Sequence, residues 1–106
     1  MEVWFGKKNL QIPDVKKSLG IKGLMFCSKE KANPLLLNSA KPIHSFFVFF
    51  NFLVLWLNSE DKVVEWKIVK PWSLHEKSKK KFSKILEIPL NQRYKEVIRQ
   101  ITSSSI

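Results

Sequence analysis

The chain has 106 residues, of which 44% are hydrophobic and 26% are charged, and its formal net charge is +10. This composition is typical of a single globular domain and excludes an intrinsically disordered chain. The single cysteine, Cys27, excludes an internal disulfide and a multi-cysteine zinc site. His44 and His75 have no ligand-like spacing, so we expect no metal and no other cofactor. The excess of lysine either favours an anionic partner or serves only to keep the surface soluble.

The first twelve residues, MEVWFGKKNLQI, do not resemble an export signal, because an acid comes early and no apolar block follows a basic region. Together with the unpaired cysteine, this pattern predicts a cytoplasmic protein. No apolar run reaches the roughly 20 residues that a membrane-spanning helix needs. We expect one domain over residues 1–101 and a frayed tail over residues 102–106.

The N-terminal third predicts short elements. Residues 2–5 and 10–12 are expected to form two strands joined by a tight turn. A proline follows, and Asp14 is placed to cap a short N-terminal helix over residues 15–25. Three leucines at residues 35–37 predict a short strand at the edge of a sheet.

The most apolar stretch is residues 46–57, FFVFFNFLVLWL, close to the middle of the chain. Alternation along a strand places apolar side chains on both of its faces. Such a strand should be buried on both sides or curled inside a barrel. Asn51 is its one polar residue, and we interpret it as a bulge that divides the run into two strand segments.

A polar turn at residues 58–61 separates this run from residues 62–69, and the pair predicts an antiparallel hairpin. Residues 84–88 predict another strand. Residues 91–101 carry an apolar stripe at helical spacing behind Asn91, a good N-cap, and predict an amphipathic C-terminal helix. The expected fold is α+β: a mixed, mostly antiparallel, strongly curled and barrel-like sheet, with a short N-terminal helix and the C-terminal helix.

Several short fragments occur together in a recognisable order. They are KGLMF at 22–26, IHSFFV at 43–48, KVV at 62–64, KPW at 70–72 and LEIP at 86–89. In this order the chain resembles, over residues 10–90, the bacterial and archaeal family called domain of unknown function 192. The resemblance implies a compact α+β domain with a mixed, curled sheet, and it implies no activity. Leu53 stands where the family usually carries an aspartate, so that acid is missing here.

The first functional hypothesis is a non-catalytic accessory domain that holds a small molecule or a protein partner on the concave side of its sheet. The converging polar and aromatic groups would be His44, Ser45, Trp72 and Glu87. A hydrolase-like enzyme that uses His44 and Ser45 is a weaker alternative, because adjacent residues of a strand point to opposite faces. We therefore predict no catalytic residues.

The second functional hypothesis is sequence-independent binding of nucleic acid, or of another anionic surface, through the lysine-rich flanks. The densest basic run consists of Lys77, Lys79, Lys80, Lys81 and Lys84. Against this hypothesis, most aromatic residues lie in the apolar run instead of among the lysines, so a platform on which bases could stack is missing. Trp4 and Trp72 are the only aromatic residues expected near a basic surface.

Overall fold

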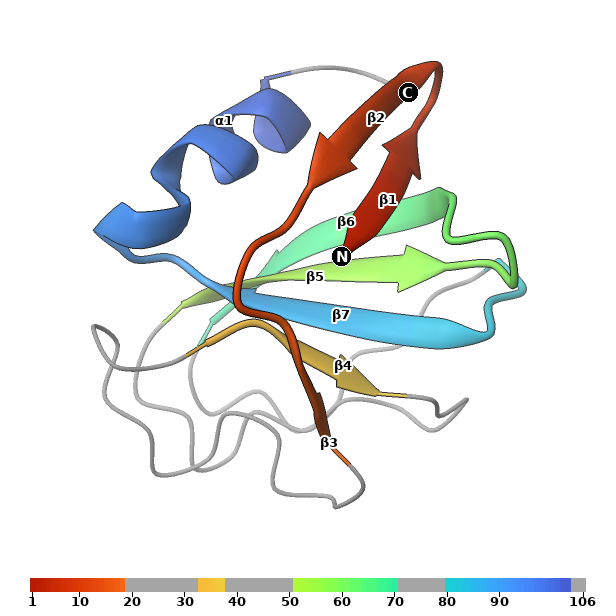
Figure 1. The fold of residues 1–106 in the computed structure, drawn as a ribbon, viewed down its shortest axis with the longest axis horizontal. Helices are drawn as coiled ribbons and strands as arrows, with labels where there is room; N and C mark the ends of the chain where they lie inside the picture. The colour runs from red at the N-terminus through yellow and green to blue at the C-terminus, as the bar shows by residue number, and fades with distance from the viewer. Residues whose placement is uncertain (19–32, 38–50, 71–79, 104–106) are drawn as a thin grey trace.

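The computed structural model describes residues 1–18, 33–37, 51–70 and 80–103. A five-stranded sheet lies at its centre, in the order β3-β4-β7-β5-β6 (Figure 1). Its strands are β3 (Lys16–Ser18), β4 (Leu35–Leu37), β7 (Lys84–Pro89), β5 (Phe52–Leu57) and β6 (Val63–Val69). β3 and β4 are parallel, and the other neighbouring pairs are antiparallel.

The middle of the sheet is β5, in which every residue is buried. One side of the sheet, the helix face, carries Leu53, Leu55 and Leu57. The other side, the opposite face, carries Phe52, Val54 and Trp56. Since burying one such side chain stabilises a fold by about 1.5–3 kcal/mol, β5 contributes to two cores at once. The prediction that this run is buried on both sides is confirmed for β5, and residues 46–50 lie outside the described part.

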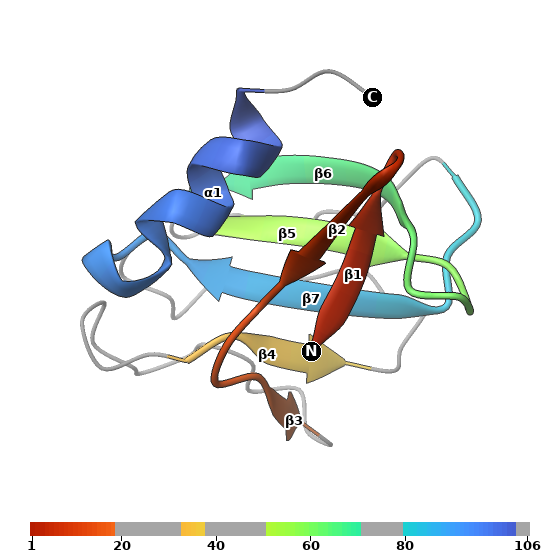
Figure 2. The ribbon, with the colours of Figure 1, turned by 45° about the horizontal axis from the view of Figure 1, so that its top comes forward.

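The helix face is covered by a separate two-stranded hairpin and by the C-terminal helix α1 (Figures 1 and 2). The hairpin consists of β1 (Glu2–Phe5) and β2 (Lys8–Gln11), as the sequence predicts, although β2 begins earlier than expected. Gly6 makes the turn with a φ of 63°, which glycine adopts without steric cost. The hairpin residues in the core of the helix face are Val3, Phe5 and Leu10, followed by Ile12 just after β2.

The predicted hairpin of β5 and β6 is confirmed, and the side chain of Asn58 organises its turn. Asn58 Oδ1 accepts hydrogen bonds from the backbone N–H groups of Glu60, at 2.9 Å, and Lys62, at 3.0 Å. Asp61 completes the turn with a φ of 62°. A register shift between Trp56 and Leu57 introduces an irregularity at the start of β6.

The amphipathic C-terminal helix is also present, but its first turn is tighter than predicted. Asn91 Oδ1 accepts a hydrogen bond from Arg93 N–H at 3.0 Å and caps the 3-10 helix η1 (Gln92–Tyr94), which leads into α1 (Lys95–Thr102). Tyr94 is buried, and its hydroxyl lies 3.4 Å from Asp14 Oδ2. None of the helices in the described residues is long and apolar enough to cross a membrane.

The prediction of a strongly curled, barrel-like sheet is wrong. The described strands form an open sheet that ends at β3 and β6, and the first hairpin packs across its face instead of extending it (Figure 2). A strand that is apolar on both faces needs cover on both sides. Closing a barrel and stacking layers satisfy that need equally well, so the sequence pattern did not distinguish them.

The prediction of a short N-terminal helix is wrong as well. Lys16–Ser18 form strand β3, and Lys16 N–H donates a hydrogen bond to Pro34 O at 2.9 Å. Asp14 has a φ of 61°, whereas an N-cap residue normally has extended backbone. Because β3 pairs with β4, the three leucines of β4 lie inside the sheet and not at its edge. The rest of the expected helix, residues 19–25, lies outside the described residues.

Candidate functional site

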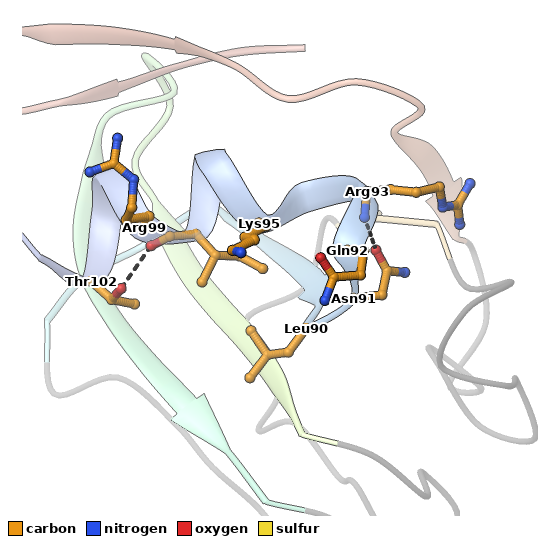
Figure 3. Close-up of a pocket in the computed structure, with 8 residues that line it drawn as sticks. Leu90, Asn91, Gln92, Arg93, Lys95, Arg99 and Thr102 are labelled. Atoms are coloured by element: carbon orange, nitrogen blue, oxygen red, sulfur yellow. Dashed lines mark hydrogen bonds between the residues drawn. The ribbon is translucent and has the colours of Figure 1, made fainter.

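A shallow groove runs along η1 and α1 and has a volume of about 560 Å³. The apolar residues that line it are Leu90 and Ile98, and the cationic ones are Arg93, Lys95 and Arg99. In Figure 3, the side chains of Arg93 and Arg99 extend from the two ends of this helical segment, and Leu90 lies beneath it. The remaining lining residues are neutral and polar: Asn91, Gln92 and Thr102. The groove therefore combines an apolar part with positive charge, and none of its described lining residues is acidic.

The amphipathic sequence of α1 produces this arrangement. The apolar stripe of the helix is drawn to the helix face of the sheet, which leaves the basic residues on the outer side. Arg99 donates hydrogen bonds to the carboxylate of Glu96, from Nη2 at 2.5 Å and from Nε at 3.2 Å. The hydrogen bond from Arg99 lowers the pKa of Glu96. Arg93 lies over the ring of Tyr94, with its guanidinium carbon 5.2 Å from the ring centre.

A second hollow, of about 400 Å³, lies where the end of α1 meets β2. It is lined by Lys8, Asn9 and Leu10 from the hairpin and by Arg99, Gln100 and Ser103 from the end of the helix. Arg99 borders both hollows, so their positive charges form one region. We call Lys8, Arg93, Lys95 and Arg99 the α1 basic surface.

Trp4 is an exposed aromatic residue of β1. It is 40% exposed, and with Ile68 it makes up the large, exposed hydrophobic residues of the described chain. Trp4 is paired with Asn9 across the hairpin, so the two side chains point to the same side. Asn9 lines the second hollow, whereas the backbone of Trp4 meets the β5–β6 turn through a bridge to Lys62.

The lysine run that the sequence singled out is only partly described. Lys77 and Lys79 lie outside the described residues. Lys80 and Lys81 are exposed and line a third hollow of about 450 Å³ beside the turn that follows β5. Lys84 instead forms an ion pair with Asp61, with Nζ 2.6 Å from Oδ1. Both partners are partly buried, and their ion pair holds the first residue of β7 against the β5–β6 turn.

Of the predicted pocket residues, the structure describes only Glu87, while His44, Ser45 and Trp72 lie outside the described residues. Glu87 is 4% exposed on the opposite face of β7, between Val54 of β5 and Leu35 of β4. Burial raises the pKa of its carboxyl group from 4.5 to about 8, so the group is mostly protonated at neutral pH. Its Oε1 atom is buried and has no hydrogen-bond partner among the described residues.

Trp56 provides a second buried polar atom on the same face. Within the part of the chain that the structure describes, its Nε1 also lacks a hydrogen-bond partner. Trp56 pairs with Ile85 across the strands, which makes it a diagonal neighbour of Glu87. Unpartnered buried groups are costly and call for an explanation. A protonated carboxyl group and an indole N–H can both donate a hydrogen bond, so together they suit a ligand with acceptor atoms.

The described residues contain no group of three or more histidine, cysteine, aspartate or glutamate side chains that could hold a metal ion. The sequence did not predict the groove along α1, because the amphipathic pattern of the helix indicates only that it packs on the sheet. The signal that could have revealed it is the charge of the polar side of that helix. Three of its residues, Arg93, Lys95 and Arg99, are basic, and one, Glu96, is acidic.

Comparison with known proteins found no match among protein-family models, curated proteins or solved structures. The resemblance to domain of unknown function 192 therefore stays a prediction. The functional argument depends on the geometry of the chain itself.

Proposed function

We propose that this chain binds single-stranded nucleic acid, without sequence preference, through the α1 basic surface. The observation that carries the proposal is the groove along η1 and α1, whose described lining contains three cationic residues and no acidic residue. A net charge of +10 supports it, because a strongly basic domain attracts polyanions over long range. The single cysteine favours the cytoplasm as the place of this activity.

The apolar part of the groove and the exposed indole favour a single strand over a duplex. In a duplex the bases are stacked and paired, so a protein meets mainly phosphates. In a single strand the bases can leave the stack and pack on apolar and aromatic side chains. Leu90 and Ile98 offer such a surface in the groove, and Trp4 offers an exposed aromatic ring on the β1–β2 hairpin. Stacking on one aromatic side chain contributes about 1–3 kcal/mol per base.

In this mode, different residues contact the phosphates and the bases. Arg93 and Arg99 are suited to phosphate oxygens, because the guanidinium group presents several N–H donors in a plane. Lys95 adds a compact positive charge between them. None of these side chains reads a base edge in the proposed mode, so binding is independent of sequence and weakens as salt rises.

Fluorescence anisotropy with labelled single-stranded RNA, single-stranded DNA and duplex DNA tests the proposal at two salt concentrations. We expect the triple variant R93E/K95E/R99E to lose at least about tenfold in affinity for the single strands, because phosphate contacts are replaced by repulsion. The matched control K16E/K80E/K81E changes the net charge equally at exposed lysines elsewhere. Equal losses in both variants, or no binding of the wild type at low salt, would contradict the proposal.

The second candidate function is a small-ligand site on the opposite face, within a non-catalytic accessory domain. It is favoured by the unpartnered Glu87 Oε1 and Trp56 Nε1. Ligand-observed NMR with small, neutral carbonyl compounds at pH 6 tests it, since both donors are then available. We expect binding to the wild type that is lost in E87L and weakened in W56F. No binding by any compound in the set would contradict this function.

A further inference from the structure

Strand β6 ends the five-stranded sheet on one side. Among the described strands it forms a ladder with β5 alone, and β1 meets this part of the chain through an isolated bridge between Trp4 and Lys62, just before β6 begins (Figure 2). An end strand of seven residues presents backbone donors and acceptors along its outer edge, and these can pair with another strand. Ile68, near the end of β6, is 39% exposed although it is a large apolar residue.

Two oppositely charged residues lie on either side of Trp66 in the middle of β6. Glu65 precedes Trp66 and Lys67 follows it. Both charged side chains lie on the opposite face, because their partners in β5 are Trp56 and Val54. Trp66 and Ile68 lie on the helix face, where their partners in β5 are leucines.

We propose that β6 pairs antiparallel with β6 of a second copy of this chain, with Trp66 at the two-fold axis. In this register Glu65 of each copy lies directly across from Lys67 of the other, on the same side of the joined sheet. Opposite charges at such a cross-strand position stabilise the pair, and like charges destabilise it. The interface is isologous, because the same residues are used by both copies.

Charged residues on an end strand usually protect it from pairing with other chains. Here the two charges complement each other under the two-fold operation, so they select one register and one partner. Glu65 and Lys67 already take part in interactions within the chain, so the new ion pairs determine the register and the backbone ladder supplies the main attraction. The register shift at the start of β6 limits the regular ladder to the stretch around Trp66.

The proposed axis runs through the sheet, so both copies keep α1 and the β1–β2 hairpin on the same side of the joined sheet. Two α1 basic surfaces would then face one strand of nucleic acid together. Dimer formation itself does not depend on nucleic-acid binding, because β6 carries none of the residues of the α1 basic surface. A monomer that binds nucleic acid, or a dimer that does not, separates the two proposals.

Sedimentation velocity over an about 100-fold concentration range tests the dimer. We expect a reversible dimer for the wild type. E65K and K67E each place like charges across the interface and should raise the dimer dissociation constant at least about tenfold. The double variant E65K/K67E restores opposite charges and should restore the dimer. A wild type that stays monomeric, or a double variant as weak as both single variants, overturns the proposal.

Disulfide trapping gives a second measurement that does not depend on the charge variants. In a C27S background, W66C places one cysteine of each copy at the axis, where residues directly across from each other are about 4.5–5.5 Å apart between Cα atoms, within the range of a disulfide. We expect rapid formation of a linked dimer under mild oxidation. The control I68C does not face its own copy in this register and should link slowly. Equal or no linkage in both variants contradicts the proposal.

Discussion

The carboxyl group of Glu87 lies between two apolar strands, where no described charged side chain pairs with it. Its pKa is raised to about 8 by burial, whereas the unfolded chain has the ordinary value of 4.5. Between these two values the unfolded state loses its proton and the folded state keeps it. The folded state then binds more protons than the unfolded state, so the free energy of unfolding falls as pH rises.

This difference predicts a measurable pH dependence of stability. The stabilising contribution of the protonated Glu87 is fully present below pH 4.5 and is lost as the pH rises toward about 8. The free energy of unfolding should fall by about 1.4 kcal/mol per pH unit through this window. In E87Q, which has nearly the same shape and no titration, this slope should disappear. Urea unfolding at pH 5, 6, 7 and 8 measures it, and an equal slope in both proteins would contradict the assignment.

Among the secondary-structure elements, the strands were predicted correctly where the sequence shows both an apolar run and a clear end to that run. β5, β6 and β7 combine an apolar or β-branched run with a polar turn or a proline at the end. The C-terminal helix has both an apolar stripe and Asn91 as a cap. In each of these cases, the local sequence and the packing favour the same structure.

The prediction of an N-terminal helix was wrong because its local sequence signals were weak. It depended on Asp14 as a possible cap and on an apolar pattern interrupted by Gly20 and Gly23. In the fold, Lys16–Ser18 gain backbone hydrogen bonds from β4, a partner distant in the sequence. No local pattern shows such a parallel pairing, so propensity alone gave the wrong element. The groove along α1 was missed similarly, since it arises from where the helix sits on the sheet.

At the scale of the whole molecule, the charge of the chain is spread over a small globule. The exposed basic residues of the described chain lie on the first hairpin, on β3, in β6 and directly on either side of it, in the segment before β7, and on η1 and α1. An ion pair such as that of Arg99 with Glu96 lies at the surface. Surface pairs of this kind contribute little stability. Because the sequence has 19 basic residues and 9 acidic ones, we expect mutual repulsion among the cations to be the main electrostatic effect on the folded state.

This repulsion predicts that salt stabilises the protein. Sodium chloride screens the charges, so the wild-type Tm should rise by about 2–6 °C between low and moderately high salt. Chloride is the appropriate anion, because sulfate also raises Tm through its exclusion from protein surfaces. The variant R93E/K95E/R99E has a lower net charge and should show a smaller rise. A Tm that is independent of salt in both proteins would mean that the basic residues lie too far apart to repel. The α1 basic surface would then lack the concentrated positive potential that polyanion binding requires.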